Sequence, residues 1–272
     1  MDDSPQIIAK RAASFGTAAA EYARYRPDYP LAAIRWLLAP LTEAIREPRQ
    51  QLTLLDLGAG TGKLTAQLAE LTIGAGRPRV TAVEPDPEML AELRRQLPDV
   101  TAMPGRAEAI PLAGGSVDAV LAGQSAHWFD LDRAIPEIAR VLRPGGVLGA
   151  VWNADDSRTD WVAGLHRASG RRTSVPVSGA ASDDEEIAGW LGQAGQELFW
   201  PAEGSEYDHS QLQTADSMIA TLGTHSAFLI MEPEEREAAL TEVRNYLAAT
   251  PQTASGEFRL PMRTLALRAV RR

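Results

Sequence analysis

The 272-residue chain contains no cysteine, which excludes a disulfide framework, a thiolate nucleophile and a thiolate metal site. Lysine occurs only at positions 10 and 63, and the formal net charge is −9. A protein that binds a phosphate backbone needs a positive face, so this balance argues against a nucleic-acid partner. No apolar run approaches the roughly 18 residues of a membrane-spanning helix. The opening M-D-D-S-P-Q is unlike a signal peptide, so we expect a cytoplasmic protein with no membrane partner.

The order of apolar and helical segments predicts the fold class. From residue 52 onward, short apolar runs alternate with helical stretches, which is typical of a parallel sheet covered by helices on both faces. The expected strands are 52–57, 79–83, 99–103, 117–122 and 147–153, and the expected helices are 63–71, 87–97, 130–142 and 232–248. Two strand-like pieces, 257–260 and 263–270, end the chain. They are too close for a helical crossover, so one of them should pair antiparallel. We therefore predict an α/β, doubly wound, mostly parallel seven-stranded sheet.

Four segments are expected along the chain. Residues 1–50 form an N-terminal helical cap with helices over 12–25 and 31–41, joined to the sheet by a polar connection at 46–50. Residues 51–153 form the core, and 233–272 supply the last helix and strands that complete it. Between them, 154–232 is read as an insertion over the carboxyl edge of the sheet. This insertion is expected to hold a helix opening at the capping box 182–185, a strand within 196–207 and a helix over 214–222.

A glycine-rich turn is the strongest local signal. Residues 52–64, L-T-L-L-D-L-G-A-G-T-G-K-L, read as a buried strand, a Gly-x-Gly-x-Gly turn and a helix start, a geometry that directs backbone N–H groups at a nucleotide-like ligand. The spacing is tighter than the dinucleotide fingerprint. Asp56 would repel a pyrophosphate and attract an ammonium group. Glu84 ends the second strand, where a carboxylate accepts from both ribose hydroxyls. The ligand should carry an adenosine and an amino-acid group without phosphates.

Further segments resemble one family. L-D-L-G-A-G-T-G-K-L, V-T-A-V-E-P-D-P-E-M-L, P-G-R-A-E-A-I-P-L, V-D-A-V-L-A-G-Q-S-A-H-W-F-D and A-R-V-L-R-P-G-G-V-L are similar to successive motifs of class I S-adenosylmethionine-dependent methyltransferases. The flanking F-G-T-A-A-A-E-Y-A-R-Y-R-P-D-Y-P and the C-terminal G-E-F-R-L-P-M-R-T-L-A-L-R-A-V resemble the small-molecule branch, the trans-aconitate and UbiE-type enzymes (methyltransferase type 11). The resemblance implies a Rossmann-like fold, S-adenosylmethionine as cofactor, a small-molecule methyl acceptor, and a monomer or homodimer.

The resemblance also assigns residues to the cofactor. These are Tyr22, Arg26, Asp56, Gly58, Ala59, Gly60, Thr61, Glu84, Pro85, Met89, Ala107, Glu108, Gly123 and Gln124. Asp56 would lie near the ammonium group and Glu84 at the ribose, while Pro85 and Met89 would flank the adenine. The segment P-G-R-A-E-A-I-P-L would lie beside the adenine ring, with Ala107 and Glu108 at its edge. Relatives often carry aspartate where this chain has Arg106, which leaves an acidic contact to the adenine amine open.

Methyl transfer from a sulfonium is an in-line displacement, so alignment supplies up to ~7–11 kcal/mol and a general base a further ~10²–10⁴-fold. His127, just after the strand 117–122, is the candidate base because imidazole titrates near neutral pH. The alternative for His127 is a structural or cofactor-contacting role. Tyr22 is the second predicted catalytic residue. Trp128, with Tyr22, Tyr25 and Tyr29, is expected to form an aromatic wall around the sulfonium or a flat substrate. The predicted substrate residues are Tyr25, Tyr29, Trp128 and Trp152.

Other functions remain open on the sequence alone. Within methyltransferases, carbon methylation of an indole-like aromatic acceptor is an alternative. A non-catalytic cofactor-binding protein is another. An NAD-dependent dehydrogenase would share the sheet and the ribose acid, but Asp56 and the tight glycine spacing disfavour it. The four histidines lie far apart without ligand spacing, so no metal site is expected.

Overall fold

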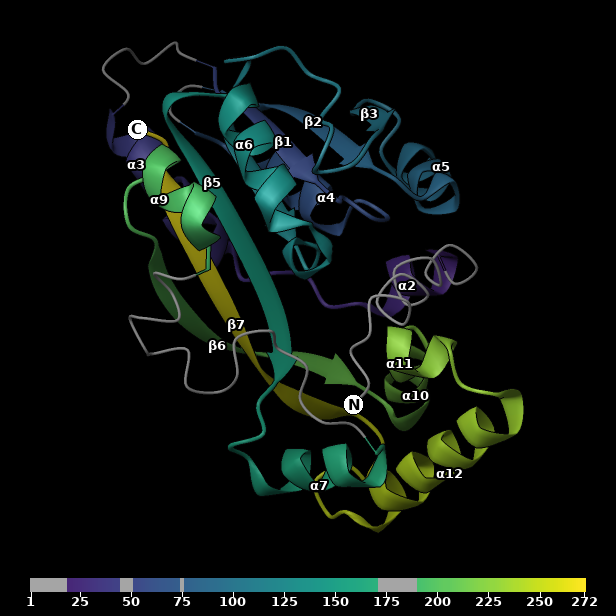
Figure 1. Ribbon diagram of the computed structural model, residues 1–272. Coiled ribbons are helices and arrows are strands. Elements are labelled where there is room, and N and C mark those ends of the chain that lie inside the picture. Colours follow the sequence, from purple (N-terminus) through teal and green to yellow (C-terminus); the bar gives the residue numbers. More distant parts are fainter. Residues whose placement is uncertain (1–18, 45–50, 74–75, 171–189) are drawn as a thin grey trace. The chain divides into compact units, whose positions relative to one another are not determined.

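The computed structural model describes residues 19–44, 51–73, 76–170 and 190–272 (Figure 1). Its strands form one seven-stranded sheet in the order β3-β2-β1-β4-β5-β7-β6. Strand β1 pairs parallel with both β2 and β4, and β2–β3 and β4–β5 are parallel as well. The sheet is mixed, with one antiparallel strand. The predicted doubly wound, mostly parallel seven-stranded sheet is confirmed.

The strands are β1 (Thr53–Leu57), β2 (Arg79–Glu84), β3 (Thr101–Pro104), β4 (Val117–Gly123), β5 (Leu142–Asp155), β6 (Glu203–Gln213) and β7 (Phe258–Val270). The helices are α2 (Ala19–Tyr25), α3 (Leu31–Ala44), α4 (Lys63–Glu70), α5 (Pro87–Gln96), η2 (Ala126–Trp128), α6 (Leu131–Val141), α7 (Asp160–Ala168), α9 (Gly192–Leu198), α10 (Ala215–Gly223), α11 (Ser226–Leu229) and α12 (Pro233–Ala249).

The chain divides into two compact units. Unit 1 comprises the described residues of Met1–Pro27, Asn153–Ser178 and Asp208–Arg263, and unit 2 those of Asp28–Trp152, Gly179–Tyr207 and Thr264–Arg272. Strands β5, β6 and β7 therefore contribute residues to both units. The two compact units do not coincide with the four predicted segments. Residues 28–44, predicted as part of the N-terminal cap, belong to the same unit as most of the sheet, and α12, predicted to complete the core, belongs to the same unit as α7. The functional roles assigned to those segments stay predictions.

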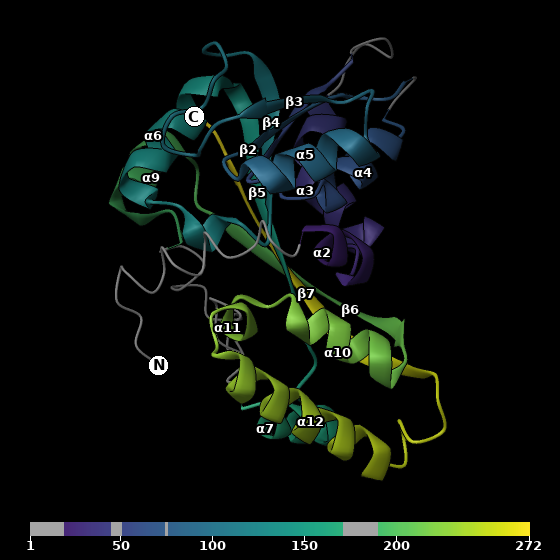
Figure 2. The same cartoon turned by 90° about the vertical axis from the view of Figure 1, so that its right-hand side faces the viewer.

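Unit 2 is a three-layer core, with α3, α4 and α5 on one face of the sheet and α6 and α9 on the other (Figure 2). The alternation of side chains along each strand builds both interfaces. In β1, Leu54 packs in the cluster that contains α3 and α4, whereas Leu55 and Leu57 pack in the cluster that contains α6 and α9. Asp56 points to the same face as Leu54. It is therefore directed at α4, the helix that follows the glycine turn.

Unit 1 is a small helical cluster built with the ends of the long strands. Helices α7, α10, α11 and α12 share one apolar core with the start of β7. The core centres on Phe228, Leu222 and Val243, all fully buried. Helix α10 begins with a capping box in which the Thr214 hydroxyl accepts from Ser217 N–H, so its predicted start is confirmed.

Most predicted elements are confirmed to within a few residues, but three are wrong in part. The expected strand over 196–207 begins as helix α9 and becomes β6 only at Glu203. The two C-terminal pieces are one continuous strand, β7. Strand β5 starts at Leu142, five residues before the strand expected over 147–153. The capping box at 182–185, the connection at 46–50 and the first part of the helix predicted over 12–25 lie outside the described residues. No helix in the described ranges is long and apolar enough to span a membrane.

Candidate active site

Asp56 is a buried carboxylate near the end of β1, just before the glycine turn. Its side chain is 1% exposed, and its Oδ2 accepts a 2.6 Å hydrogen bond from the Thr65 hydroxyl on α4. Its Oδ1 is buried and has no hydrogen-bond partner among the described residues. Burial raises the pKa of Asp56 to about 7; the Thr65 hydrogen bond opposes the rise and the nearby Glu84 carboxylate adds to it. A cation with N–H donors would satisfy both the orphaned oxygen and the buried charge.

Glu84 connects the ends of β1 and β2. Its Oε2 accepts from Gly60 N–H at 2.7 Å and its Oε1 from Asp86 N–H at 2.8 Å. Burial raises the pKa of Glu84, and the two backbone hydrogen bonds oppose that rise. The carboxylate thus fixes the glycine turn, and each oxygen keeps a second lone pair for a ligand hydroxyl.

The glycine turn needs its glycines for two different reasons. Gly58 and Gly60 have φ of 68° and 57°, in the left-handed region that glycine adopts readily. A Cβ at Gly58 would lie 2.7 Å from Cβ of Ser125, so this position is closed by protein. A Cβ at Gly60 would meet no atom of the described residues within 4 Å, so this position faces open space among them. The neighbouring Thr61 is 2% exposed, and its hydroxyl has no partner among the described residues.

The segment after β4 is fastened to the end of β1. The Ser125 hydroxyl donates to the Leu57 carbonyl at 2.8 Å, next to Gly58. Gln124, before it, has a φ of 55°, and it is the only non-glycine residue with positive φ in the described ranges. Such conformations persist where the surroundings enforce them and are frequent at functional sites. This segment continues into η2, which presents His127 and Trp128.

His127 is exposed and its ring lies 4.6 Å from that of Trp128. The indole N–H of Trp152 donates to His127 Nδ1 at 3.2 Å. Trp152 itself is 2% exposed and packs edge-on against Trp190. His127 and Trp152, which are predicted in separate roles, are therefore in contact, and Trp152 orients the imidazole. Direct contact of Trp152 with a substrate stays a prediction.

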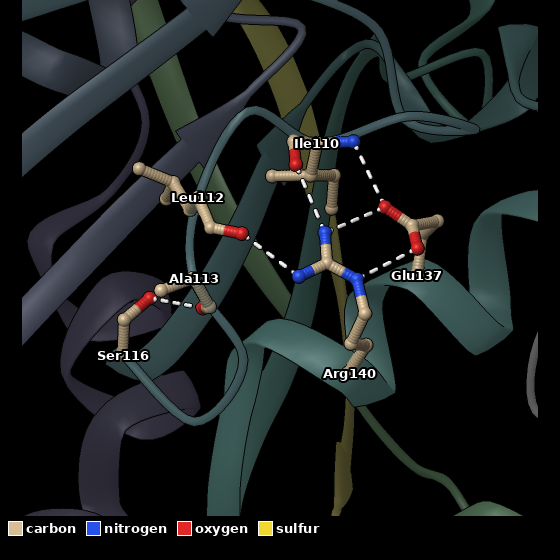
Figure 3. Close-up of polar contacts among 6 residues, drawn as sticks. All are labelled: Ile110, Leu112, Ala113, Ser116, Glu137 and Arg140. Carbon is tan, nitrogen blue, oxygen red and sulfur yellow. Dashed lines mark hydrogen bonds and ion pairs between the residues drawn. The ribbon is translucent and has the colours of Figure 1, made fainter.

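The segment after β3, assigned by resemblance to the adenine, is held against α6 (Figure 3). Arg140 donates to the carbonyls of Ile110 and Leu112 at 2.9 and 2.8 Å. It also forms an ion pair with Glu137, whose Oε2 accepts from Ile110 N–H. The Arg140 hydrogen bonds lower the pKa of Glu137. Glu108, expected at the adenine edge, accepts from Asp130 N–H at 2.9 Å and so connects this segment to the start of α6.

Some of the remaining predicted cofactor residues in unit 2 are buried and others are exposed. Met89, Ala107 and Ala59 are nearly buried, whereas Pro85 is exposed. Gly123 has no room for a side chain, because a Cβ there would lie 2.8 Å from the Tyr29 hydroxyl oxygen. These roles stay predictions.

Tyr29 is buried in the core of unit 2, and its predicted contact with a substrate stays a prediction. It is 6% exposed within the cluster of α3 and α4, and its backbone exchanges two hydrogen bonds with the Gln67 side chain.

Three of the predicted site residues lie in unit 1, namely Tyr22, Tyr25 and Arg26. The Arg26 guanidinium stacks 4.7 Å from the Tyr22 ring centroid and donates to the side chain and carbonyl of Thr224. The Tyr25 carbonyl accepts from Gln211 and Thr221. Their proposed contacts to the cofactor stay predictions.

Two residues of the site are not predicted by the sequence. Thr65 lies within the predicted helix 63–71, and its place in the first turn after the glycine turn is the one signal for it. Ser125 stands next to the glycine turn only because β1 and β4 are neighbours in the sheet, which no local pattern reveals. In the described ranges, no group of three or more His, Cys, Asp and Glu is placed to hold a metal ion.

This sheet, with a glycine turn and two carboxylates at the ends of β1 and β2, is typical of α/β proteins that bind an adenosine-containing ligand at the carboxyl ends of their strands. A methyltransferase domain model matches residues 55–150. An uncharacterized methyltransferase of Mycobacterium tuberculosis (H37Rv) is 40% identical over 257 residues, which is 94% of this chain and 95% of that one. One of Schizosaccharomyces pombe is 32% identical over 91% of this chain and 93% of its own.

A solved structure, of a proposed type II methyltransferase from Anaeromyxobacter dehalogenans, is 28% identical with a TM-score of 0.62, covering 91% of this chain and 98% of that one. The chain belongs to the class I S-adenosylmethionine-dependent methyltransferase family, and its cofactor is S-adenosylmethionine. The dehydrogenase alternative is therefore wrong, and the chain is an enzyme. The trans-aconitate and UbiE-type branch stays a prediction.

The residues present fit this cofactor. A buried carboxylate with an orphaned oxygen suits its ammonium group, and a bidentate acid at the end of β2 suits its ribose. The open space above Gly60 admits a ligand where a side chain would intrude.

Proposed function

We propose that the enzyme methylates a small-molecule acceptor that meets the segment from Gln124 to Trp128. The observation that supports this most is the Ser125 hydrogen bond to the carbonyl of Leu57, which fixes this segment to the strand that carries the cofactor turn. In this segment His127 is exposed and Trp128 is half-buried, so both side chains can contact an acceptor. The net charge of −9 is unfavourable for a nucleic-acid acceptor.

The cofactor supplies an electrophilic methyl group on a sulfonium when bound. Asp56 would bind its ammonium group and Glu84 its ribose hydroxyls, while the segment held by Arg140 would lie along its adenine. These contacts fix the donor, so that the enzyme gains rate chiefly by aligning the acceptor atom with the methyl group and excluding water. The aromatic face of Trp128 suits a cationic or flat group. A monomeric or homodimeric state belongs to this proposal as an expectation.

The test is incubation of the full chain with methyl-labelled S-adenosylmethionine and a cell extract separated into small-molecule, nucleic-acid and protein fractions. We expect enzyme-dependent label in the small-molecule fraction, where mass spectrometry identifies the product and the methylated atom. The Asp56→Asn variant is the matched control, because it loses the cofactor contact while it keeps the shape of the side chain. Label confined to nucleic acid or protein would refute the proposal.

A further inference from the structure

The hydrogen bond between Trp152 and His127 has a directional consequence. An indole N–H is a donor only, so His127 Nδ1 must accept in the 3.2 Å contact. In a neutral imidazole one nitrogen carries the proton and the other carries the lone pair. With Nδ1 as acceptor, the proton is on Nε2. This ring nitrogen is thus a hydrogen-bond donor.

The same contact opposes a proton-accepting role. A general base takes a proton onto its lone pair, and the only lone pair in this tautomer is at Nδ1, where the Trp152 N–H already binds. After proton uptake both nitrogens carry hydrogens, and the Nδ1 hydrogen would face the Trp152 donor. In the other neutral tautomer the proton is on Nδ1 and the lone pair on Nε2 could act as a base. The Nδ1 hydrogen would then again face the Trp152 N–H, so two donors would meet.

The fold holds Trp152 rigidly in this position. β4 and β5 are parallel neighbours with Gly123 opposite Val151, so Trp152 follows Val151 at the same sheet edge where the His127 segment begins. Gln124 N–H donates to the Val151 carbonyl at 2.9 Å and fastens the two strand ends together. Trp190 packs edge-on against the Trp152 ring, with the centroids 6.1 Å apart. A buried indole held on several sides has little freedom to turn its N–H away.

We propose that Trp152 is a positioning residue that fixes His127 as a hydrogen-bond donor at Nε2, so that His127 orients the methyl acceptor and does not remove a proton from it. The proposal rests on the proposed function for the contact between His127 and an acceptor. It replaces the base role expected from the sequence. The acceptor must then bring an atom that attacks the methyl group without help from a base at His127. The bond from sulfur to the methyl carbon breaks as the new bond to that atom forms, and the electron pair stays on sulfur.

The deciding measurement is the nitrogen-15 NMR spectrum of the full, histidine-labelled chain with S-adenosylhomocysteine added, with the His127→Gln variant to identify the His127 signals. We expect one neutral tautomer, with Nε2 in the protonated range and Nδ1 in the unprotonated range. In Trp152→Phe, which loses the N–H, we expect the His127 signals to shift toward a mixture of tautomers. Trp200→Phe, at an exposed position, should leave them unchanged. A proton on Nδ1 in the wild type would overturn the proposal without need of any variant.

Turnover provides the second readout, with the acceptor found in the labelled-methyl screen. The Gln side chain places an N–H donor near the position of Nε2 but cannot act as a base. Loss of a hydrogen bond to a charged acceptor in His127→Ala should lower kcat about 10–100-fold, and His127→Gln should recover most of it. Equal losses of ~10²–10⁴-fold in both variants would show a base and overturn the proposal. An Nε2 proton in a chain that labels no small molecule would refute the proposed function alone.

Discussion

Asp56 is the residue at which the chemistry of the cofactor and the stability of the fold oppose each other. An ionised carboxylate with one unpaired oxygen in a nearly dry site is costly, and a bound ammonium group offsets that cost. The sequence predicted the residue and its ligand group from position alone. It did not predict the raised pKa, because that depends on burial under α4 and on the distance to Glu84.

A pH dependence follows from the raised pKa of Asp56. The unfolded chain ionises near the ordinary value of 3.8, whereas the folded chain holds the proton up to about 7. Its contribution to stability is therefore complete below about pH 4 and is lost as the pH rises through about 7. Asp56→Asn removes this loss, so its melting temperature relative to wild type should rise between about pH 4 and 7 and stay level above that. Differential scanning fluorimetry across this range measures it, and parallel curves for the two proteins would contradict it.

The affinity for the cofactor should change with pH in the opposite sense. Because an ammonium group binds the ionised form, titration calorimetry with S-adenosylhomocysteine should show wild-type affinity rising up to about pH 7 and levelling above it. Asp56→Asn should bind weakly at every pH, with no such rise.

The two glycines of the turn should respond differently to a methyl group. Gly58→Ala combines a positive φ with a 2.7 Å clash against Ser125, so it should lower the free energy of unfolding by several kcal/mol. Gly60→Ala has positive φ but open space, so it should cost only about 1–2 kcal/mol while it lowers the affinity for S-adenosylhomocysteine. Denaturant unfolding and calorimetry separate the two effects. Unchanged binding by a folded Gly60→Ala would show that the ligand does not use this space.

At the scale of elements, the sequence predicted β1, β2 and β4, because these strands are short, mostly apolar runs. It failed where tertiary packing overrides local preference. The two glycines of α9 disfavour a helix, yet Leu198 and Phe199 anchor it in the core beside α6. The gap expected between the pieces 257–260 and 263–270 contains Pro261, whose carbonyl accepts from Asp156 N–H, so only the proline's missing N–H donor is lost and the strand continues.

Arg140 should matter more than an ordinary surface arginine because it holds a loop. Arg140→Ala removes the hydrogen bonds to the carbonyls of Ile110 and Leu112 and should lower the free energy of unfolding by about 1 kcal/mol, discounted for its exposure. Hydrogen exchange of residues 106–115 should become faster, and S-adenosylhomocysteine affinity should fall if this segment lies along the adenine. Arg95→Ala is the matched control, because Arg95 pairs with Glu92 at the same spacing on α5. Equal effects of both variants would contradict a loop-holding role.

For the whole molecule, no pattern in the sequence predicts that the chain forms two units from interleaved segments. The boundary expected at 153 and 154 falls inside β5, and β6 and β7 are divided in the same way. Which residues group together is decided by long-range packing, such as that of Leu165 on α7 with Val243 on α12, and no periodicity of a single segment encodes it. The predicted cofactor contacts of Asp56, Glu84 and the glycine turn all lie in unit 2.

Cofactor binding should therefore stabilise the molecule unevenly. At a concentration of one hundred times its Kd, S-adenosylhomocysteine adds about 2.7 kcal/mol to the free energy of unfolding. This gain applies to the part of the molecule that unfolds together with the binding site. NAD at the same concentration should add nothing. If the two units unfold separately, calorimetry will show two transitions, of which only that of unit 2 moves with the ligand. Hydrogen exchange assigns the transitions, since α4 and β1 should gain protection while α7 and α12 do not. Equal protection of all four elements would show that the molecule unfolds as one cooperative body, and a shift produced by NAD would contradict the assignment of the cofactor.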